Sequence, residues 1–468
     1  MAEARVIVVG AGPAGVRAAE ELVAAGVRPI VIDEGRRDGG QIYRRQPEHF
    51  TRGYDKLYGS EAQRAASLHG SFDALRGKID YRAEALAWNI SEGQLHVVQG
   101  ARSERLPYDA LLVCSGATDR LMPVPGWELA GVFSLGAAQI ALKSQACSIG
   151  RRVVFLGSGP LLYLVAYQYL KAGASIAAVL NTARLRQQVA ALPKLLARPG
   201  LLRLGLSYML ALRGAGVPLL SGVTPLEIGG DAEDGVRSLA FRDAGGQRHE
   251  YDCDAVAMGY HLRPETQLAD LARCAFRYDA AARQWFPEVS EDGRSSVPGV
   301  YLAGDGVRIL GAEGAENAGR LAALAALADL GIADNPAGTG AHATRAARAA
   351  VLRQAQQRME RFRQGLVQAF PWPSEQAAQL PDHAIVCRCE CITAGELRRT
   401  VNEMGAQEAN RAKAFSRVGM GRCQGRYCAN AGAEVIAAAA GMPLEQVGRL
   451  RGQAPVKPLA IKTREEQV

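Results

Sequence analysis

Short apolar runs alternate with helical stretches in the first thirty residues of this chain. The run Arg5–Val9 leads into a glycine-rich turn, which is followed by the helical stretch Val16–Ala25 and, after Gly26, by a second run, Pro29–Ile32. A short continuous apolar run bounded by turn residues is typical of a strand buried in a parallel sheet. The pattern predicts a strand–helix–strand unit at the N-terminus.

The same order of elements occurs a second time in the middle of the chain. It comprises the run Arg152–Leu156, a turn at 157–160, the helical stretch Leu161–Lys171 and the run Ser175–Leu180. Two units of one design predict an α/β fold with two doubly wound dinucleotide-binding domains.

The rest of the pattern predicts how the chain divides into domains. Apolar runs at 81–90 and 95–99 indicate a β-rich insert, and an Ala/Arg/Gln-rich stretch at 341–369 favours one long helix that ends before Pro371. The expected domains are 1–120 with 285–335, 150–260, a helical linker at 340–373, and a small α-rich, cysteine-bearing domain at 384–452.

Composition narrows the class of protein. The 468 residues are 48% hydrophobic and 22% charged, which is typical of a soluble globular chain. No apolar run approaches the ~20 residues of a membrane span, and the N-terminus has no secretory pattern. Nine cysteines are too few for a secreted disulfide scaffold. We expect a cytoplasmic protein without an integral membrane segment, with the inner-membrane surface as the alternative, peripheral location.

The net charge of +8 comes entirely from the C-terminal region, because residues 341–468 hold 19 basic and 11 acidic residues. This region has no long Lys/Arg block and no aromatic RNA-binding pattern, so no nucleic-acid partner is expected. The basic side chains can instead offset an anionic cofactor or meet an acidic partner.

The first turn has the glycine spacing of a dinucleotide fingerprint. Its first glycine permits a tight turn, its second lets a pyrophosphate approach the backbone, and its third lets the helix pack closely on the strand. Glu34, after the second strand, is placed to accept hydrogen bonds from ribose hydroxyls. The residues of the turn are Gly10, Gly12, Pro13, Ala14 and Gly15.

Two further segments favour FAD as this dinucleotide. Gly40 and Gln41 belong to a glycine-pair segment that resembles the one along the cofactor in flavoproteins with two dinucleotide domains. Gly304 and Asp305 resemble the second FAD signature of those proteins, in which the aspartate binds the ribityl chain; the alternative is a helix-capping aspartate. Ala312 opens the next helix, whose positive end would favour negative charge on a reduced flavin.

The second glycine motif is degenerate. Gly157 and Gly159 are present, but Leu162 replaces the third glycine, and Asn181 stands where an acid would select the ribose of NAD. Binding of NAD(P) in this site is one alternative, and a site that is vestigial or holds only an adenine nucleotide is the other, with equal weight. His261 is either a flavin-facing residue or an ordinary loop residue.

Four cysteines lie in two close pairs near the C-terminus. A C-x-C pair suits two thiolates on one iron of a [2Fe–2S] cluster better than a zinc knuckle, although zinc and idle thiols remain alternatives. Cys391 is expected to be a spectator, and the four remaining cysteines are expected in the core. The expected cluster ligands are Cys387, Cys389, Cys423 and Cys428.

Several absences restrict the chemistry. No cysteine pair lies near Gly40 or Gly157, so a redox-active disulfide beside the flavin is excluded. No residue of the chain is identified as a catalytic base for oxidising a carbon substrate.

The segments 39–44, 304–305 and 419–426 together resemble the α (or A) subunits of heteromeric flavin-dependent amino-acid and opine dehydrogenases. This group includes octopine and nopaline oxidase, D-hydroxyproline dehydrogenase and hydrogen cyanide synthase. The cysteine region resembles bacterioferritin-associated-ferredoxin domains, although its second pair is C-x4-C where that domain usually has C-x2-C.

The resemblance implies an electron-transfer subunit that carries FAD and [2Fe–2S]. A D-amino-acid-oxidase-like flavoprotein β subunit would oxidise the C–N bond, and a small ferredoxin-like γ subunit is a further candidate partner. A stand-alone NAD(P)H-dependent reductase of a ferredoxin or quinone is the alternative function. A zinc-bound docking module on a vestigial flavoprotein is a third interpretation.

Overall fold

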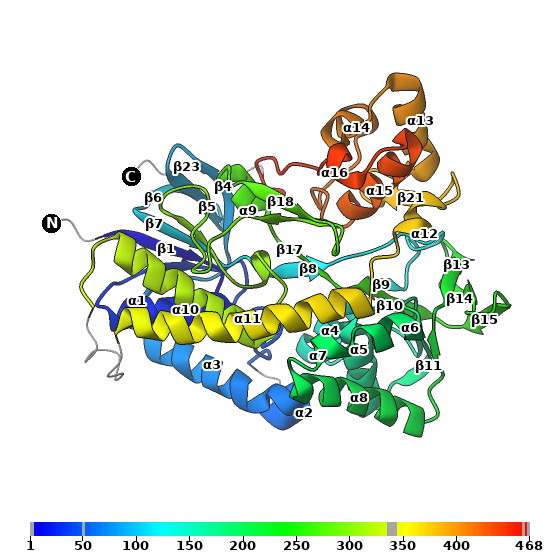
Figure 1. The fold of residues 1–468 in the computed structure, drawn as a ribbon, viewed down its shortest axis with the longest axis horizontal. Coiled ribbons are helices and arrows are strands. Elements are labelled where there is room, and N and C mark those ends of the chain that lie inside the picture. The colour runs from blue at the N-terminus through cyan, green and yellow to red at the C-terminus, as the bar shows by residue number, and fades with distance from the viewer. Residues whose placement is uncertain (1–3, 49–51, 335–343, 461–463, 466–468) are drawn as a thin grey trace.

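Two parallel sheets form the body of the protein (Figure 1). The computed structural model describes residues 4–48, 52–334, 344–460 and 464–465. The first sheet has the order β20-β7-β1-β2-β3, and all its neighbouring strands run parallel. Its strands are β1 (Val6–Val9), β2 (Ile30–Ile32), β3 (Asp80–Arg82), β7 (Ala110–Val113) and β20 (Val300–Leu302).

Helices cover one face of this sheet, and a small antiparallel sheet covers the other. All four residues of β1 are buried, which explains the continuous apolar run in the sequence. Helices α1 and α10 pack so closely that a Cβ at Gly319 would lie 2.0 Å from the carbonyl oxygen of Ala14. The helices on the first face are α1 (Pro13–Ala24), α2 (Tyr54–Tyr58), α3 (Ala62–Leu75) and α10 (Gly311–Asp329). The strands of the small sheet on the other face are β4 (Ala85–Ser91), β5 (Gln94–Gln99) and β6 (Arg102–Pro107).

The second parallel sheet has the order β12-β11-β10-β16-β9. An antiparallel sheet of β13 (Thr224–Asp231), β14 (Gly235–Arg242) and β15 (Arg248–Asp252) packs beside it. The parallel strands and their helices are β9 (Val132–Ser134), α4 (Leu135–Ser144), β10 (Arg152–Ser158), α5 (Pro160–Lys171), β11 (Ser175–Asn181), α8 (Pro199–Gly214), β12 (Leu219–Ser221) and β16 (Ala255–Tyr260). The expected pair of doubly wound domains is confirmed.

A long helix joins the two domains along one side of the molecule. Helix α11 (Arg345–Ala369) runs beside α10 at one end and beside the helices that follow β11 at the other (Figure 1). Gln356 donates a hydrogen bond to the carbonyl of Gly314 at 2.9 Å, and Gln368 donates one to Ala190 at 3.2 Å. The first residues of the expected helix, 341–343, lie outside the described residues.

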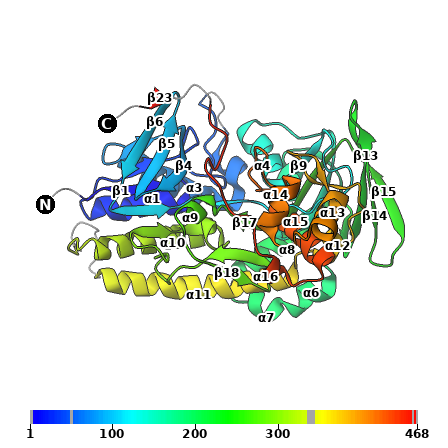
Figure 2. The ribbon, with the colours of Figure 1, turned by 90° about the horizontal axis from the view of Figure 1, so that it is seen from above.

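The C-terminal cysteine module is a compact set of short helices with its own core. In Figure 2 it lies beside the second domain and near β17 (Leu262–Pro264), which pairs with β8 (Ala117–Asp119) between the two domains. The module consists of α12 (Ser374–Ala378), β21 (Ile385–Cys387), β22 (Ile392–Thr393), α13 (Ala394–Met404), α14 (Ala409–Ser416), α15 (Ala429–Ala440) and α16 (Leu444–Val447).

The C-terminal tail returns from the module to the first domain. The amide of Val456 donates a hydrogen bond to the carbonyl of Trp88, and β23 (Arg464–Glu465) pairs in parallel with β6. None of the described helices is long and apolar enough to cross a bilayer. The expectation that all the remaining cysteines lie in the core is wrong for Cys147, which is exposed.

Candidate functional site

The first glycine turn adopts a backbone that only glycine allows. Gly10 has φ +103°, and a Cβ there would lie 2.4 Å from the carbonyl oxygen of Cys114 on the neighbouring strand connection. A Cβ on Gly15 would lie 1.7 Å from the carbonyl oxygen of Gly10, so this glycine lets α1 start against β1. Pro13 occupies the first turn of α1, where its missing N–H costs nothing.

The glycine pair at 39–40 packs directly against this turn. The amide of Gly39 donates a hydrogen bond to the carbonyl of Ala11 at 2.9 Å. A Cβ on Gly40 would lie 3.0 Å from the Cα of Gly12. The two backbones therefore form one cradle, and its close approach leaves backbone rather than side chains facing the cavity.

The acid after β2 that contacts the glycine turn is Asp33. Its carboxylate accepts hydrogen bonds from the amides of Ala11 and Gly35, at 2.5 and 2.6 Å, and burial raises its pKa. Glu34 also lines the cavity but forms an ion pair with Lys457 of the C-terminal tail. Sequence reasoning missed Asp33, although its position directly after the strand was the available signal. The role of Glu34 stays a prediction.

Asp305 lies in the short 3-10 turn Gly304–Gly306, which precedes α10, and it lines the cavity. One carboxylate oxygen accepts hydrogen bonds from the amides of Leu310 and Gly311, at 3.0 and 3.2 Å, so part of its role is helix capping. Burial raises the pKa of Asp305 to about 6. Asp305 is therefore both a capping residue and a carboxylate on the wall of the cavity.

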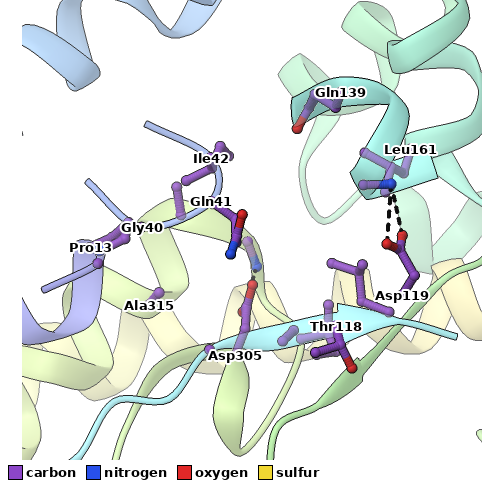
Figure 3. Close-up of a pocket in the computed structure, with 18 of the residues that line it drawn as sticks. Pro13, Gly40, Gln41, Ile42, Thr118, Asp119, Gln139, Leu161, Asp305 and Ala315 are labelled. Atoms are coloured by element: carbon purple, nitrogen blue, oxygen red, sulfur yellow. Dashed lines mark hydrogen bonds between the residues drawn. The ribbon is translucent and has the colours of Figure 1, made fainter. Parts of the chain in front are cut away.

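One cavity of about 1710 Å³ joins these elements. In Figure 3, Pro13, Gly40, Gln41 and Asp305 lie on one wall of the cavity, and Gln139, Leu161 and Asp119 lie opposite. The donor groups and the glycine cradle fit a dinucleotide, because backbone can approach its phosphates. Gly304 and Ala312 also line this cavity.

Lys143 of α4 is a buried cation in the same wall, which the sequence did not single out. Its ammonium lies 3.4 Å from the carbonyl oxygen of Ile42 and forms no ion pair with any described residue. Burial lowers the pKa of Lys143 to about 8. A lysine with this pKa is available as a positive charge or a proton donor near neutral pH.

The second glycine motif has the expected backbone but is covered by a histidine. A Cβ at Gly157 would lie 1.8 Å from the carbonyl oxygen of Gly259, and a Cβ at Gly159 would lie 3.2 Å from Nδ1 of His261. His261 hydrogen-bonds through Nε2 to the carbonyl of Phe370 at 2.8 Å, so its ring is held over the turn. Burial lowers the pKa of His261 to about 4, and the ring is neutral at pH 7.

Asn181 does not reach the cavity. It is fully buried, its amide donates to the hydroxyl of Tyr163 at 2.9 Å, and its oxygen accepts from the amide of Ala183 at 3.0 Å. Leu162 is also fully buried. The side chain at the position that would select the ribose, Asn181, is thus hydrogen-bonded within the protein, and Leu162 is packed in the core in place of the third glycine.

The four paired cysteines of the module come together. Cys428 hydrogen-bonds to Cys387 and to Cys423, and Cys423 also contacts Cys389. The hydrogen bond from Cys428 lowers the pKa of Cys387 to about 6 and that of Cys423 to about 5. Cys391, by contrast, is exposed and contacts the carbonyl of Arg388 at 3.9 Å.

The contacts between the thiols run in sequence, from Cys387 to Cys428, from Cys428 to Cys423 and from Cys423 to Cys389. In the described part of the chain, no group of three or more His, Cys, Asp or Glu side chains is arranged to hold a single metal ion. Four thiol donors match the ligand number of a [2Fe–2S] cluster, two for each iron, and also that of one tetrahedral zinc ion.

The cysteine loop 423–428 is part of the cavity wall. Cys423, Arg426 and Tyr427 line the same cavity as Gly12 and Asp305. The loop is therefore placed next to the dinucleotide cradle, although the two are more than 100 residues apart in sequence.

Two residues of the inter-domain segment hold this loop by its backbone. Arg263 donates hydrogen bonds to the carbonyls of Gly425 and Arg426, at 3.1 and 2.8 Å. Gln267 donates one to the carbonyl of Gln424 at 2.6 Å. These contacts fix the position of the loop relative to the first domain.

The fold and the cradle define a flavoprotein with two dinucleotide-binding folds and an attached iron–sulfur module. Residues 4–325 match the family described as pyridine nucleotide-disulphide oxidoreductase, and residues 385–438 match the BFD-like [2Fe-2S] binding domain. The chain belongs to this oxidoreductase family, and its cofactors are FAD and a [2Fe–2S] cluster.

Known proteins match nearly the whole length of this chain. The chain is 37% identical to an opine oxidase subunit of Rhizobium meliloti, over 97% of this chain and 86% of the relative. It is 32% identical to hydrogen cyanide synthase subunit HcnB of Pseudomonas aeruginosa, over 97% of each chain. The crystal structure of L-proline dehydrogenase from P. horikoshii has the same fold, with a TM-score of 0.67, 18% identity, and coverage of 98% of this chain and 78% of the other. The resemblance to the opine oxidase group is confirmed.

Proposed function

We propose that the chain is the electron-transfer subunit of a heteromeric dehydrogenase that oxidises an amino acid or an opine at a C–N bond. The oxidation takes place on a D-amino-acid-oxidase-like flavoprotein β subunit, and a small ferredoxin-like γ subunit is a further partner. The names of the relatives, subunits of opine oxidase and of hydrogen cyanide synthase, support this proposal. The observation that carries it is that the dinucleotide cradle and Cys423 line one and the same cavity.

The residues divide into two groups with separate roles. FAD exchanges one or two electrons and a [2Fe–2S] cluster exchanges one, so a chain with both can turn a two-electron delivery into single-electron steps. The backbone at 10–15 and 39–40 holds the FAD, with Gln41 and Glu34 beside it, and Asp305 takes the ribityl chain. The cluster ligands are Cys387, Cys389, Cys423 and Cys428.

Replacement of Cys423 by serine tests the cluster assignment. Iron and labile sulfide are expected to fall to a small fraction of the wild-type content, while FAD stays bound, because the cradle lies in a different domain. Cys391→Ser is the matched control in the same module, and its iron content is expected to be unchanged. Unchanged iron in Cys423→Ser, or loss of iron in Cys391→Ser, contradicts the ligand set. One zinc and no iron would favour the docking-module interpretation.

Anaerobic mixing of the purified chain with NADH and then NADPH tests the direction from which electrons enter. Slow or absent bleaching of the flavin band is expected, because His261 covers Gly159 and Asn181 is buried. Reduction by dithionite is the positive control. Rapid bleaching by either nucleotide would overturn the proposal and favour the stand-alone reductase.

A further inference from the structure

One buried cation on the wall of the cavity has no counter-charge among the described residues. Of the basic residues there that line the cavity, two are buried, Lys143 and Arg426. Arg426 is paired with Glu265, whereas Lys143, which is only 7% exposed, forms no ion pair with a described residue. Burial of a charged group costs free energy unless an opposite charge accompanies it. The arrangement therefore indicates a negative charge that arrives with a ligand.

Contacts on both sides hold the ammonium group of Lys143 in place. Its Nζ lies 3.4 Å from the carbonyl oxygen of Ile42 and 5.8 Å from the centre of the Tyr58 ring. The guanidinium of Arg52 donates to the carbonyl of Lys143 at 2.7 Å and ties the end of α4 to the same side of the cavity. A lysine in the last turn of a helix also complements the helix dipole, but that role does not require burial.

The cradle indicates which part of FAD comes to this cation. With the pyrophosphate at the turn 10–15 and the ribityl chain at Asp305, the flavin ring lies at the end of the cavity beyond Asp305. Figure 3 shows Ile42 on one side of the cavity and Gln139 of α4 on the other. Lys143 follows Gln139 by one helical turn, on the same face of α4, and both residues line the cavity. Lys143 therefore borders the end that takes the ring.

We propose that Lys143 stabilises the negative charge of reduced FAD and thereby raises the reduction potential of the flavin. The oxidised ring is neutral. Two electrons, from the partner flavoprotein or from dithionite, and one proton leave the ring with one negative charge. A positive charge already held beside the ring favours this state, because it needs no rearrangement and acts in a site with little water.

The side chain has the required charge when electrons arrive. Burial lowers the pKa of Lys143 to about 8, so most of the ammonium is protonated at pH 7. The inference rests on the FAD site and on neither the partner nor the substrate of the proposed function. A test on the chain alone therefore separates its failure from a failure of that function.

Lys143→Met tests the inference, because it removes the charge and keeps a long side chain. The FAD-loaded chain is reduced stepwise with dithionite against a reference dye. The flavin is followed by its absorbance, and the cluster is followed separately by electron paramagnetic resonance. The equilibrium constant for flavin reduction is expected to fall at least about tenfold, which lowers the midpoint potential of this two-electron couple by about 30 mV. The content of oxidised FAD is expected to be unchanged, because the oxidised ring has no charge.

Two variants separate the charge from other effects of the substitution. Lys143→Arg keeps a positive charge at the same position and is expected to restore most of the potential. Lys171→Met is the matched control, because it removes the same charge from the exposed end of α5, outside the cavity. Its potential is expected to equal that of the wild type, since water and salt screen a charge at that position.

Three results would overturn the inference. The first is a midpoint potential of Lys143→Met that equals that of the wild type or of Lys171→Met. The second is a potential of Lys143→Arg as low as that of Lys143→Met, because the positive charge would then not be the cause. The third is loss of oxidised FAD from both Lys143→Met and Lys143→Gln; Lys143 would then be needed to form the site and not to stabilise the reduced ring.

Discussion

At the scale of single residues, Asp305 shows how a binding group is kept at a cost to stability. Its carboxylate is partly buried in the cavity wall, and two amide hydrogen bonds do not offset the loss of water, so its pKa rises to about 6. A capping role alone would favour a solvated aspartate. Asp231 illustrates this: its side chain is 45% exposed, accepts hydrogen bonds from two backbone amides, and has a lowered pKa. The burial of Asp305 is therefore explained by its position on the FAD cavity.

Asp305→Asn is expected to separate ligand binding from stability. In the FAD-free protein the folded-state pKa of Asp305 is above that of the unfolded chain, so its stabilising contribution is present below about pH 4 and is lost as the pH rises through about 6. The Tm of the FAD-free variant minus that of the wild type should therefore increase between about pH 4.5 and 7.5, while FAD retention falls.

Thermal melts at several pH values and the flavin-to-protein absorbance ratio after gel filtration check this prediction. Asp231→Asn is the matched control, because its pKa is shifted in the opposite direction. A Tm difference for Asp305→Asn that is flat with pH, or full FAD retention, would contradict the account of Asp305.

At the scale of elements, the sequence predicted what depends on local patterns. The continuous run 6–9 and the turn at 10–15 specify a buried strand followed by a helix, because neighbours along the chain determine both. The expected helix at 16–25 begins earlier, at Pro13, since proline suits the first turn of a helix. The glycine turn, Asp305 and the four cysteines were singled out from short motifs, and their roles as FAD and cluster ligands stay predictions.

Elements that depend on distant partners were not predictable in the same way. Strand β23 has two residues and pairs with β6 more than 300 residues earlier. The ring of His261 covers Gly159 only because Phe370, at the end of α11, accepts its hydrogen bond. The sequence likewise places two acids side by side at 33 and 34. It does not show that the carboxylate of Asp33, and not that of Glu34, turns toward the amide of Ala11.

At the scale of the whole molecule, the cysteine module is locked to the body by buried polar contacts. The guanidinium of Arg426 forms an ion pair with Glu265 at 2.6 Å and donates to the carbonyls of Cys423 and Val456. It thereby connects the inter-domain segment, the cluster loop and the C-terminal tail. Away from Arg426, further ion pairs join the module to the body, namely Arg449 with Asp270 and Arg283 with Glu434. A fixed distance between cluster loop and FAD cradle follows from these contacts.

Glu265→Gln is expected to loosen this attachment. The side chains of Arg426 and Glu265 are only 9% and 15% exposed, so the substitution leaves a largely buried cation without its counter-charge. The expected loss is about 3 kcal/mol in the free energy of unfolding of the module, together with faster proteolysis near 453–457. Urea unfolding followed by the visible absorbance of the cluster measures the first, and limited trypsin digestion measures the second.

The matched control is Asp234→Asn, which removes an ion pair with Arg237 in which the side chains of Arg237 and Asp234 are 59% and 69% exposed. Water screens that pair, so its removal should leave the urea midpoint nearly unchanged. If Glu265→Gln unfolds at the same urea concentration as this control, the ion pair does not hold the module. In that case the backbone contacts of Arg263 and Gln267 suffice to place the cluster loop beside the FAD cradle.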